Sequence, residues 1–559
     1  MHDTPRWLVT AALFTLVALG GRAAGAQEPD YADVNAYILQ AEMALQREDY
    51  LMAVQEYRKA AHLSDNPDIA KKATATAIAY GFDDEALLAA KRWFELDEAD
   101  DARAYLAQLS LRTGDIRAAK RHFSVLIEKS KEPPGEKLLM LAGFISDEGD
   151  ARDADKLLRA LARPYDDSPE AHRAVASLAL RSGDVEHALE RLSRAIELDP
   201  DNLSARLMYA RALLAHGEVD EAIDYTARLI GDDFDPDPNA RIELAVLYMM
   251  ADRTEDALSQ VSQVMLEQPG RTDALRLMGI INFHNENLDA AWDDFHDLLA
   301  SGDYSNDALY YLGQIAHYRE ETDRAIRFYS EVKTGQYALQ SQQRAAGLMA
   351  SEKDDLKGAI ELLDQFAAES PAHAIDVLGA KAQLLAMEEE RADALKYYDK
   401  IAKFRPDDER YVLARAELLL RMERLDDALD AYADAVKRWP KSALALNAYG
   451  YTLADRTDRF KEAEKLIRKA LKYDPGRAAI IDSMGWVLFK LGRHEEALVE
   501  LERAYTMMQD HEVAAHIVET LVALDRRDEA LERLADAEAL KPDSALLKDV
   551  RDRLFPDAP

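Results

Sequence analysis

The chain has 559 residues, a formal net charge of −35 and no cysteine. The missing cysteine excludes disulfides, thiolate metal sites, cysteine catalysis and lipid attachment through a cysteine. The negative charge argues against binding to nucleic acids or anionic membranes, which depends on Lys and Arg; it favours a solvated outer face over one specific basic partner. Ala, Leu, Glu, Asp, Arg and Lys dominate, which predicts a helical protein.

The first 26 residues are expected to form a secretory signal peptide. Arg6 precedes a short apolar run over residues 7–20, and small residues ending in Ala24-Gly25-Ala26 follow it. This order of a basic start, an apolar run and an Ala-x-Ala site is typical of exported proteins. We predict cleavage after Ala26 and a periplasmic mature chain. Asp3 weakens the basic start, so an uncleaved membrane-associated N-terminus is the alternative.

One pattern then recurs along the whole chain, in which charged residues precede an alanine that is usually followed by Leu or Ile. Fifteen copies can be marked, and the spacing between successive alanines is always 33 to 35 residues. The marked alanines are Ala53, Ala86, Ala119, Ala154, Ala188, Ala222, Ala257, Ala291, Ala325, Ala359, Ala394, Ala428, Ala463, Ala497 and Ala530.

Three further residue types stand at fixed distances from the marked alanines, and we call this shared position the repeat phase. A proline that would end a second helix stands 12 residues after the alanine, at Pro200, Pro269, Pro371, Pro406, Pro440, Pro475 and Pro542. A glycine that would let two helices cross closely stands 12 residues before it, at Gly279, Gly313, Gly347 and Gly485. An aromatic residue stands one helical turn after it, at Tyr57, Phe123, Phe295, Tyr329, Tyr398 and Tyr432.

Together these markers resemble the tetratricopeptide repeat, a helix–turn–helix unit of about 34 residues. The resemblance implies an all-α solenoid, a right-handed superhelix of about fifteen helical hairpins with a long concave groove. We expect the repeat array to occupy residues 27–542 without a second folded domain, and residues 543–559 to form a capping helix and tail. Residues 128–137, which contain Pro133 and Pro134, are expected to form a longer and flexible connection.

A candidate binding site lies on the first helices of two adjacent repeats near the C-terminus. Asn447 and Asp482 are expected to point toward the concave face, with Tyr451 and Trp486 beside them. Aromatic anchors with a few fixed polar groups are typical of peptide-binding grooves. The alternative is structural, with Asn447 and Asp482 bonding to each other or capping neighbouring turns.

Residues 459–472, RFKEAEKLIRKALK, depart from the acidic remainder with six basic and two acidic residues. Such a run forms either a solvated helix face or a docking patch for an acidic partner.

Signs of catalysis and of bound cofactors are missing from the sequence. It contains no HExxH, Walker, G-x-S-x-G or EF-hand motif. His511 and His516 are five residues apart and share a helical face poorly, whereas helical zinc sites prefer a spacing of three or four. Residues 231–239, GDDFDPDPN, could hold a hard cation weakly, but the two prolines favour a plain connecting loop. We therefore predict a non-enzymatic protein with no catalytic residue, metal or cofactor.

The last repeats resemble a narrower family. The stretches ALNAYGYTLADRTDRFKEAEKLIRKALKYDP and AAIIDSMGWVLFKLGRHEEALVELERAY are similar to the C-terminal part of a family of exported proteobacterial repeat proteins. The resemblance implies an outer-membrane adaptor that binds and activates a periplasmic carboxy-terminal processing serine protease and recruits its cell-wall hydrolase substrates. Adaptors of that type carry a lipobox cysteine, which this chain lacks, so a freely periplasmic form is expected.

Three functions remain in consideration. The first is a periplasmic protein-binding scaffold, with the protease adaptor as its specific form. The second is a scaffold for exopolysaccharide export or envelope assembly, which would use the same repeats. The third is an enzyme acting on cell-wall glycans, which would need a catalytic group that the sequence does not offer.

Overall fold

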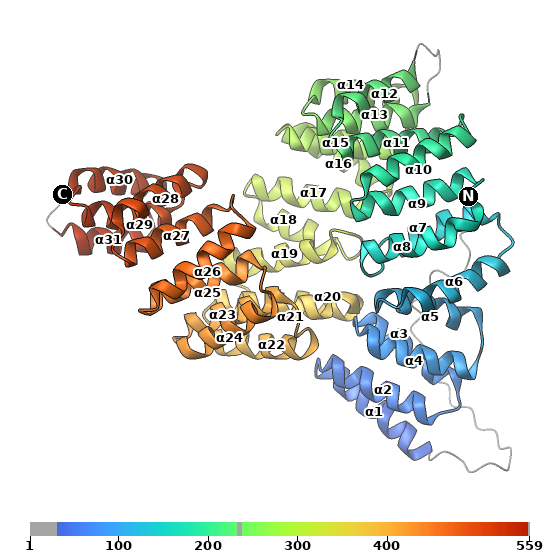
Figure 1. Cartoon of the computed structure of the whole chain (residues 1–559), viewed down its shortest axis with the longest axis horizontal. Coiled ribbons are helices and arrows are strands. Elements are labelled where there is room, and N and C mark those ends of the chain that lie inside the picture. The colour runs from blue at the N-terminus through green and yellow to red at the C-terminus, as the bar shows by residue number, and fades with distance from the viewer. Residues whose placement is uncertain (1–30, 232–236, 557–559) are drawn as a thin grey trace. The chain divides into compact units, whose positions relative to one another are not determined.

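The computed structural model describes residues 31–231 and 237–556, and this part of the chain contains 31 α-helices, two short 3-10 helices and no strand. Successive helices pair into fifteen hairpins, and one further helix follows them (Figure 1). The odd-numbered helix comes first in each hairpin and the even-numbered helix second. This arrangement confirms the predicted all-α tetratricopeptide-repeat solenoid. The expected signal peptide, residues 1–26, lies outside the described residues.

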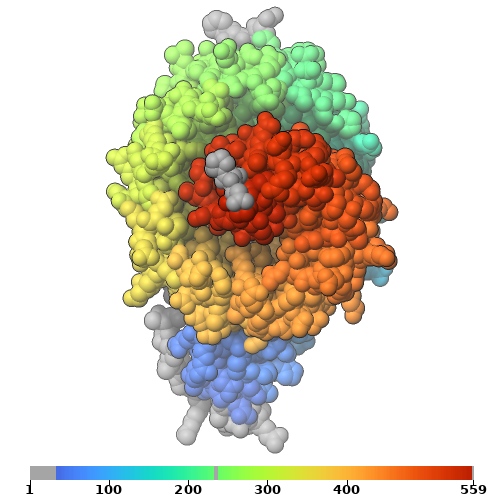
Figure 2. All heavy atoms as spheres, turned by 90° about the vertical axis from the view of Figure 1, so that its left-hand side faces the viewer, coloured from blue at the N-terminus to red at the C-terminus, as the bar shows by residue number. Residues whose placement is uncertain are grey.

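The described helices fall into two compact units, one ending at Val377 and the other beginning at Leu378. The sequence predicted one array over residues 27–542, and the repeat spacing runs through this boundary without a change. In the second unit, neighbouring repeats follow one another in close contact, as the orange to red atoms of Figure 2 show.

The first unit contains twenty α-helices, two 3-10 helices and the start of α21. They are α1 (Tyr31–Gln46), α2 (Tyr50–Leu63), α3 (Pro67–Ala79), α4 (Asp83–Leu96), α5 (Asp100–Arg112), α6 (Ile116–Lys129), α7 (Pro134–Ile145), α8 (Ala151–Ala162), η1 (Arg163–Tyr165), α9 (Pro169–Ser182), α10 (Val185–Leu198), α11 (Leu203–His216), α12 (Val219–Ile230), α13 (Pro238–Met250), α14 (Thr254–Glu267), α15 (Thr272–His284), α16 (Leu288–Ser301), α17 (Ser305–Tyr318), α18 (Thr322–Glu331), α19 (Ala338–Lys353), α20 (Leu356–Glu369) and η2 (Pro371–His373).

The boundary falls inside α21, and the second unit holds the remaining helices. They are α21 (Ala374–Met387), α22 (Arg391–Phe404), α23 (Glu409–Arg421), α24 (Leu425–Arg438), α25 (Ala443–Arg456), α26 (Phe460–Tyr473), α27 (Ala478–Lys490), α28 (His494–Met507), α29 (His511–Ala523), α30 (Arg527–Leu540) and α31 (Ala545–Leu554).

The marked alanines are the points at which the two helices of a hairpin meet. All fifteen have an exposed fraction of 0%. Any larger side chain would have to displace its neighbours, because protein interiors are packed as densely as organic crystals. The repeat phase derived from the sequence is therefore confirmed at every copy.

The marker glycines allow close approach in three of their four positions. A methyl group on Gly485 would lie 2.5 Å from Leu501 Cγ and 3.2 Å from the carbonyl oxygen of Ala497. The same addition would lie 2.7 Å from the Tyr329 ring at Gly313 and 3.0 Å from the Phe295 ring at Gly279. The expectation is wrong for Gly347, because no neighbouring atom lies within 4 Å of its added methyl group.

The turn inside fourteen of the fifteen hairpins contains one residue with left-handed backbone geometry, and the α25–α26 turn is the exception among the described hairpins. In the α9–α10 hairpin, for example, Gly183 has a φ of 82° and the N–H of Asp184 donates to the carbonyl oxygen of Ala179 at 2.8 Å. This geometry ends a helix and satisfies its last carbonyl groups. Fourteen hairpins share it, with glycine or an acidic residue at Glu48, Gly81, Gly114, Gly149, Gly183, Gly217, Asp252, Glu286, Glu320, Asp354, Glu389, Glu423, Gly492 and Asp525.

The connections between hairpins follow the proline marker. Each of the seven marker prolines is the second residue after the end of an even-numbered helix, as predicted. The connection expected to be long at residues 128–137 is short, since only residues 130–133 lie between α6 and α7. The buried Lys137 ammonium group holds it closed by donating to the carbonyl oxygens of Ile127 at 2.6 Å and Ser130 at 2.7 Å.

The last helix, α31, covers the apolar side of the final hairpin. Its Leu547 and Val550 are fully buried, and the following Phe555 is 3% exposed. They pack against residues of α29 and α30, including Ile517 and Leu534. A terminal repeat has no neighbour on its outer side, so such a helix removes apolar surface from water.

The glycine contacts predict opposite effects of one substitution at two equivalent sites. Gly485→Ala should lower the free energy of unfolding by about 1–3 kcal/mol, because the new methyl group meets the backbone of α28. Gly347→Ala should be neutral or raise it by roughly 0.5–1 kcal/mol, because alanine favours a helix interior. Thermal unfolding followed by circular dichroism measures both. Equal shifts in the two variants would contradict the close crossing at Gly485.

Candidate functional site

The odd-numbered helices of the second unit form one continuous surface. Helix α25 packs on α23 and α27, and α29 packs on α27 and α31. We call the surface formed by α25, α27 and α29 the inner face. Asn447 and Tyr451 lie on α25, and Asp482 and Trp486 lie on α27, so all four predicted site residues belong to it.

Asp482 makes its main contact with a residue that the sequence prediction did not include. Its Oδ1 lies 2.9 Å from Nδ1 of His516 on α29, and both side chains are more than nine-tenths buried. Burial alone would lower the pKa of His516, but the hydrogen bond and charge of Asp482, with Glu512 and Glu519 nearby, raise that pKa above its ordinary value. The pair therefore favours a protonated imidazole held by a carboxylate. The expected alternative, a bond between Asn447 and Asp482, is not formed.

Trp486 packs beside this pair and offers no free ring face. It is 5% exposed, and its ring stacks on that of His516 with centroids 4.1 Å apart. Phe489 stacks on it at 5.0 Å, and the Lys490 ammonium group lies 4.4 Å from its ring centre. The expectation that Trp486 is an exposed aromatic anchor for a ligand is therefore wrong; the ring instead shields the Asp482–His516 pair from water.

Tyr451 is half-buried and reaches across to α29. Its hydroxyl group donates to Glu512 Oε1 at 2.5 Å. Burial raises the pKa of Tyr451 most strongly, and the charges of Glu512, Asp455 and Asp482 raise it further. Tyr451 therefore stays a neutral hydroxyl among carboxylates, and it links the first and third helices of the inner face.

The exposed strip of α25 is the part of the inner face that a partner can reach. Leu444, Asn447, Tyr451 and Asp455 follow one another at spacings of three and four residues, so they share one side of the helix. Leu444 is 49% exposed and Asp455 is exposed. The exposed leucine offers an apolar contact, and the amide, hydroxyl and carboxylate groups beside it are of the kind found at the polar rim of an interface.

Two buried polar atoms of the inner face have no hydrogen-bond partner among the described residues. They are Oδ1 of Asn447, an acceptor, and Nε1 of Trp486, a donor. A buried polar atom without a partner destabilises a fold by about 1–3 kcal/mol. Asn447 is thus the one predicted residue for which the structure shows no internal role.

Sequence reasoning missed His516 and Glu512. His516 lies 34 residues after Asp482, the length of one repeat. His516 therefore occupies the position in the next repeat that Asp482 occupies in its own. The 34-residue spacing could have indicated this partner, but from the sequence His516 was considered only as a zinc ligand with His511.

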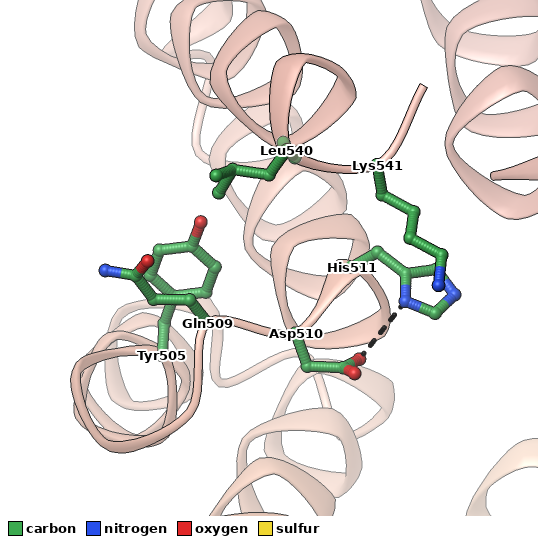
Figure 3. Close-up of a pocket in the computed structure, with 7 residues that line it drawn as sticks. Tyr505, Gln509, Asp510, His511, Leu540 and Lys541 are labelled. Carbon is green, nitrogen blue, oxygen red and sulfur yellow. Dashed lines mark ion pairs between the residues drawn. The ribbon is translucent and has the colours of Figure 1, made fainter. Parts of the chain in front are cut away.

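A small pocket lies beside the inner face, where α28 leads into α29 (Figure 3). It has a volume of about 180 Å³. The Leu540 side chain points toward Tyr505 and Gln509 on one side, and the ion pair of His511 Nδ1 with Asp510 Oδ1 lies on the other at 3.6 Å. The pocket could accept one small side chain of a partner.

The sequence also offered candidates for a metal site. Across the described residues, no group of three or more His, Asp or Glu side chains could hold a metal ion. The acidic stretch at residues 231–239 lies partly outside the description. Within the described ranges, no helix has the length and apolar character needed to cross a bilayer.

Comparison with protein families agrees with this architecture. A family described as "Tetratricopeptide repeat" matches residues 179–238, and a second with the same description matches residues 413–478 and 456–507. The repeated hairpins and these matches define the class: the chain contains tetratricopeptide repeats, which are typical of protein-binding scaffolds. The second set of matches covers α25 and α27, where the four predicted residues lie.

Among individual relatives, the chain is similar to the TPR repeat-containing protein PA4667 of Pseudomonas aeruginosa. The two are 35% identical over 214 residues, which make up 38% of this chain and 36% of that protein. The chain is also 29% identical over 142 residues to the protein CTR9 homolog of Arabidopsis thaliana, covering 25% of this chain and 12% of that one. The matches thus span about a third or less of these relatives.

Solved structures with a similar fold include yeast Tom70 and the Cut9-Hcn1 hetero-tetramer of the APC/C. Tom70 is 16% identical and gives a TM-score of 0.38 over 75% of this chain and 94% of its own. The Cut9-Hcn1 structure is 14% identical and gives a TM-score of 0.34 over 93% of this chain and 96% of its own.

The Asp482–His516 pair predicts a measurable titration. Asp482→Asn should lower the pKa of His516, because the neutral amide removes the charge that opposes burial. In the unmodified protein the folded-state pKa is raised, so the stabilisation is complete below about pH 6.5 and is lost as pH rises through the folded pKa. NMR titration of His516 in the variant and in the unmodified protein measures this shift. An unchanged His516 pKa would contradict the pairing.

Proposed function

We propose that this chain is a non-enzymatic, exported scaffold that binds protein segments on the inner face of α25, α27 and α29. The observation that carries the proposal is the exposed strip of α25, where Leu444 and Asn447 lie on a support of buried side chains. Asn447 Oδ1 lacks an internal partner, and Leu444 exposes apolar surface that the fold does not use. Burying Leu444 against a partner would remove apolar area from water.

The rigid support of this strip favours binding over catalysis. Asp482 and His516 are buried against each other, and Trp486 covers them. No reacting group is presented to solvent by this pair. An acid–base pair that serves catalysis must reach a substrate atom within hydrogen-bond distance, whereas this pair ties α27 to α29 and holds the surface in shape.

We further propose that the partner is a carboxy-terminal processing serine protease, which the scaffold activates and to which it brings cell-wall hydrolase substrates. Support comes from the resemblance of the last repeats, including α25 and α27, to the exported adaptor family. The similarity to the tetratricopeptide protein of Pseudomonas aeruginosa is consistent with it. The signal-like residues 1–26 support a periplasmic location, where such a protease and its substrates meet.

The direct test is a degradation assay with purified components. The full chain is added to a carboxy-terminal processing protease from the same source, with a cell-wall hydrolase as substrate. We expect the chain to bind the protease and to accelerate degradation. If the chain binds the protease without accelerating degradation, it is a scaffold that does not activate the protease. The absence of binding, together with cross-links to polysaccharide-export components, would overturn the protease proposal in favour of the export scaffold.

Changes in the exposed strip should weaken binding without unfolding the protein. Leu444→Ala combined with Asn447→Ala should lower affinity for the protease by about tenfold, as expected when an interface centre loses 1–2 kcal/mol. Melting should be nearly unchanged, because neither side chain supports the core. Val499→Ala is the matched control, since Val499 is 68% exposed on the even-numbered helix α28.

Asp482 is unsuited to this test. Its replacement would leave His516 buried without its partner, which destabilises the fold in its own right. An affinity loss in the Leu444/Asn447 variant that equals the loss in the Val499 control would show that the inner face is not the binding surface.

A further inference from the structure

Helix α26 carries a row of four exposed lysines. Lys461, Lys465, Lys469 and Lys472 are all exposed, and their spacings of four, four and three residues place them on one side of the helix. None of them has an ion-pair or hydrogen-bond partner in the described part of the chain. We call these four residues the lysine row.

The two acidic residues of α26 are already engaged elsewhere. Glu464 pairs with Arg468 at 2.7 Å and with Arg493 at 2.9 Å, and Glu462 pairs with Arg459 at 2.8 Å. On the neighbouring even-numbered helices, acidic residues likewise pair with arginines of their own, as Asp427 does with Arg424 on α24 at 2.7 Å. The arginines of this region are therefore neutralised, while the lysines remain free.

Helix stability does not account for the row. Like charges four residues apart repel one another along a helix. Lysines favour the C-terminal turn, but Lys461 is the second residue of α26 and lies at the positive end of the helix dipole. The helix is held instead by the buried Ala463, Ile467 and Ala470. Lys472 lies in the last turn, where a cation is favourable, but the like charges of Lys461, Lys465 and Lys469 oppose local stability.

We propose that the lysine row, with Tyr473 at its end, is a docking surface for an acidic segment of a partner protein. Tyr473 is 41% exposed and offers an aromatic contact beside the charges. Lys461, Lys465 and Lys469 lie about 6 Å apart along the helix axis, and Lys472 lies about 4.5 Å beyond Lys469. Carboxylates on every fourth residue of a partner helix have the same spacing, so one acidic helix face fits the row.

Charge complementarity selects a protein segment over a membrane. A short acidic helix confines its charge to the row, whereas an anionic lipid surface would also face the acidic residues of α24 and α28. A second copy of this chain is disfavoured as the partner, because two chains of net charge −35 repel each other. The inference is independent of the protease proposal, since it concerns an even-numbered helix and a partner defined only by its charge.

The test uses the full chain and a fluorescent Ala-based peptide of about 16 residues with Glu at every fourth position. Anisotropy is measured at low ionic strength, where exposed ion pairs are least screened. The unmodified chain should bind, and Lys461→Gln, Lys465→Gln, Lys469→Gln and Lys472→Gln combined should weaken binding about tenfold or more. Salt of about 0.5 M should weaken it as well.

The matched control changes the net charge equally without touching the row. It combines Lys437→Gln, Lys441→Gln, Lys541→Gln and Lys548→Gln, four exposed lysines scattered over the same unit. This variant should bind the peptide like the unmodified chain, and both variants should keep the original melting temperature. Equal losses in the two variants, or no peptide binding by the unmodified chain, would overturn the proposal.

Two further outcomes would also overturn it. Sedimentation of the chain with phosphatidylglycerol vesicles, abolished by the four row substitutions, would assign the row to a membrane. Self-association in analytical ultracentrifugation, abolished by the same substitutions, would assign it to a second copy. The proposal predicts that neither result is seen. It also predicts that the chain still prefers the Glu peptide.

Discussion

The contact between the two helices of each hairpin, made at an alanine with no exposed surface, is the constraint on which the rest of the structure depends. At fifteen places an alanine with no exposed surface stands where the two helices of a hairpin pack together. At three places the partner position has even less room and holds glycine. One hairpin cannot bury its remaining apolar side alone, so each repeat relies on the next. The fold is thus a sum of neighbour contacts.

This dependence explains where binding surfaces arise. The faces that meet inside and between hairpins are fixed by packing, which leaves only the outward sides of the helices free to differ. The inner face consists of such outward sides of odd-numbered helices, and the lysine row lies on the outward side of an even-numbered helix. Both lie on helices supported by a dense core, so their side chains are held in place without contributions from loops. The Asp482–His516 pair adds a polar tie between two repeats.

The repeat architecture could be predicted from the sequence because its cause is periodic. Alanine, proline and aromatic residues recur in one phase, and each has a single physical role at its position. Gly347 shows the limit of this reasoning, since its place in the phase matches that of Gly485 but its neighbours do not approach it. The boundary after Val377 was not predicted either, because the spacing of the markers does not change there.

The candidate site was predicted only in part, for a related reason. Position in the repeat identified Asn447, Tyr451, Asp482 and Trp486 as residues of one surface. It did not show how far each side chain is buried. In the structure, the Trp486 ring is covered by His516, Phe489 and Lys490. Phe489 and Lys490 cover the ring from its own helix α27, and His516 covers it from the following repeat. The His516 contact joins residues that one helix pattern, considered alone, does not connect.

The inner face is assembled in a fixed order, because two of its contacts need α29. Tyr451 bonds to Glu512, and Asp482 bonds to His516. The chain is synthesised from the N-terminus, so α25 and α27 are made before α29. Until then Asp482 and Tyr451 are exposed without their partners. The inner face becomes complete only when α29, close to the C-terminus, has emerged and packed. A partner that recognises the finished surface therefore engages only chains in which α29 has packed against α27.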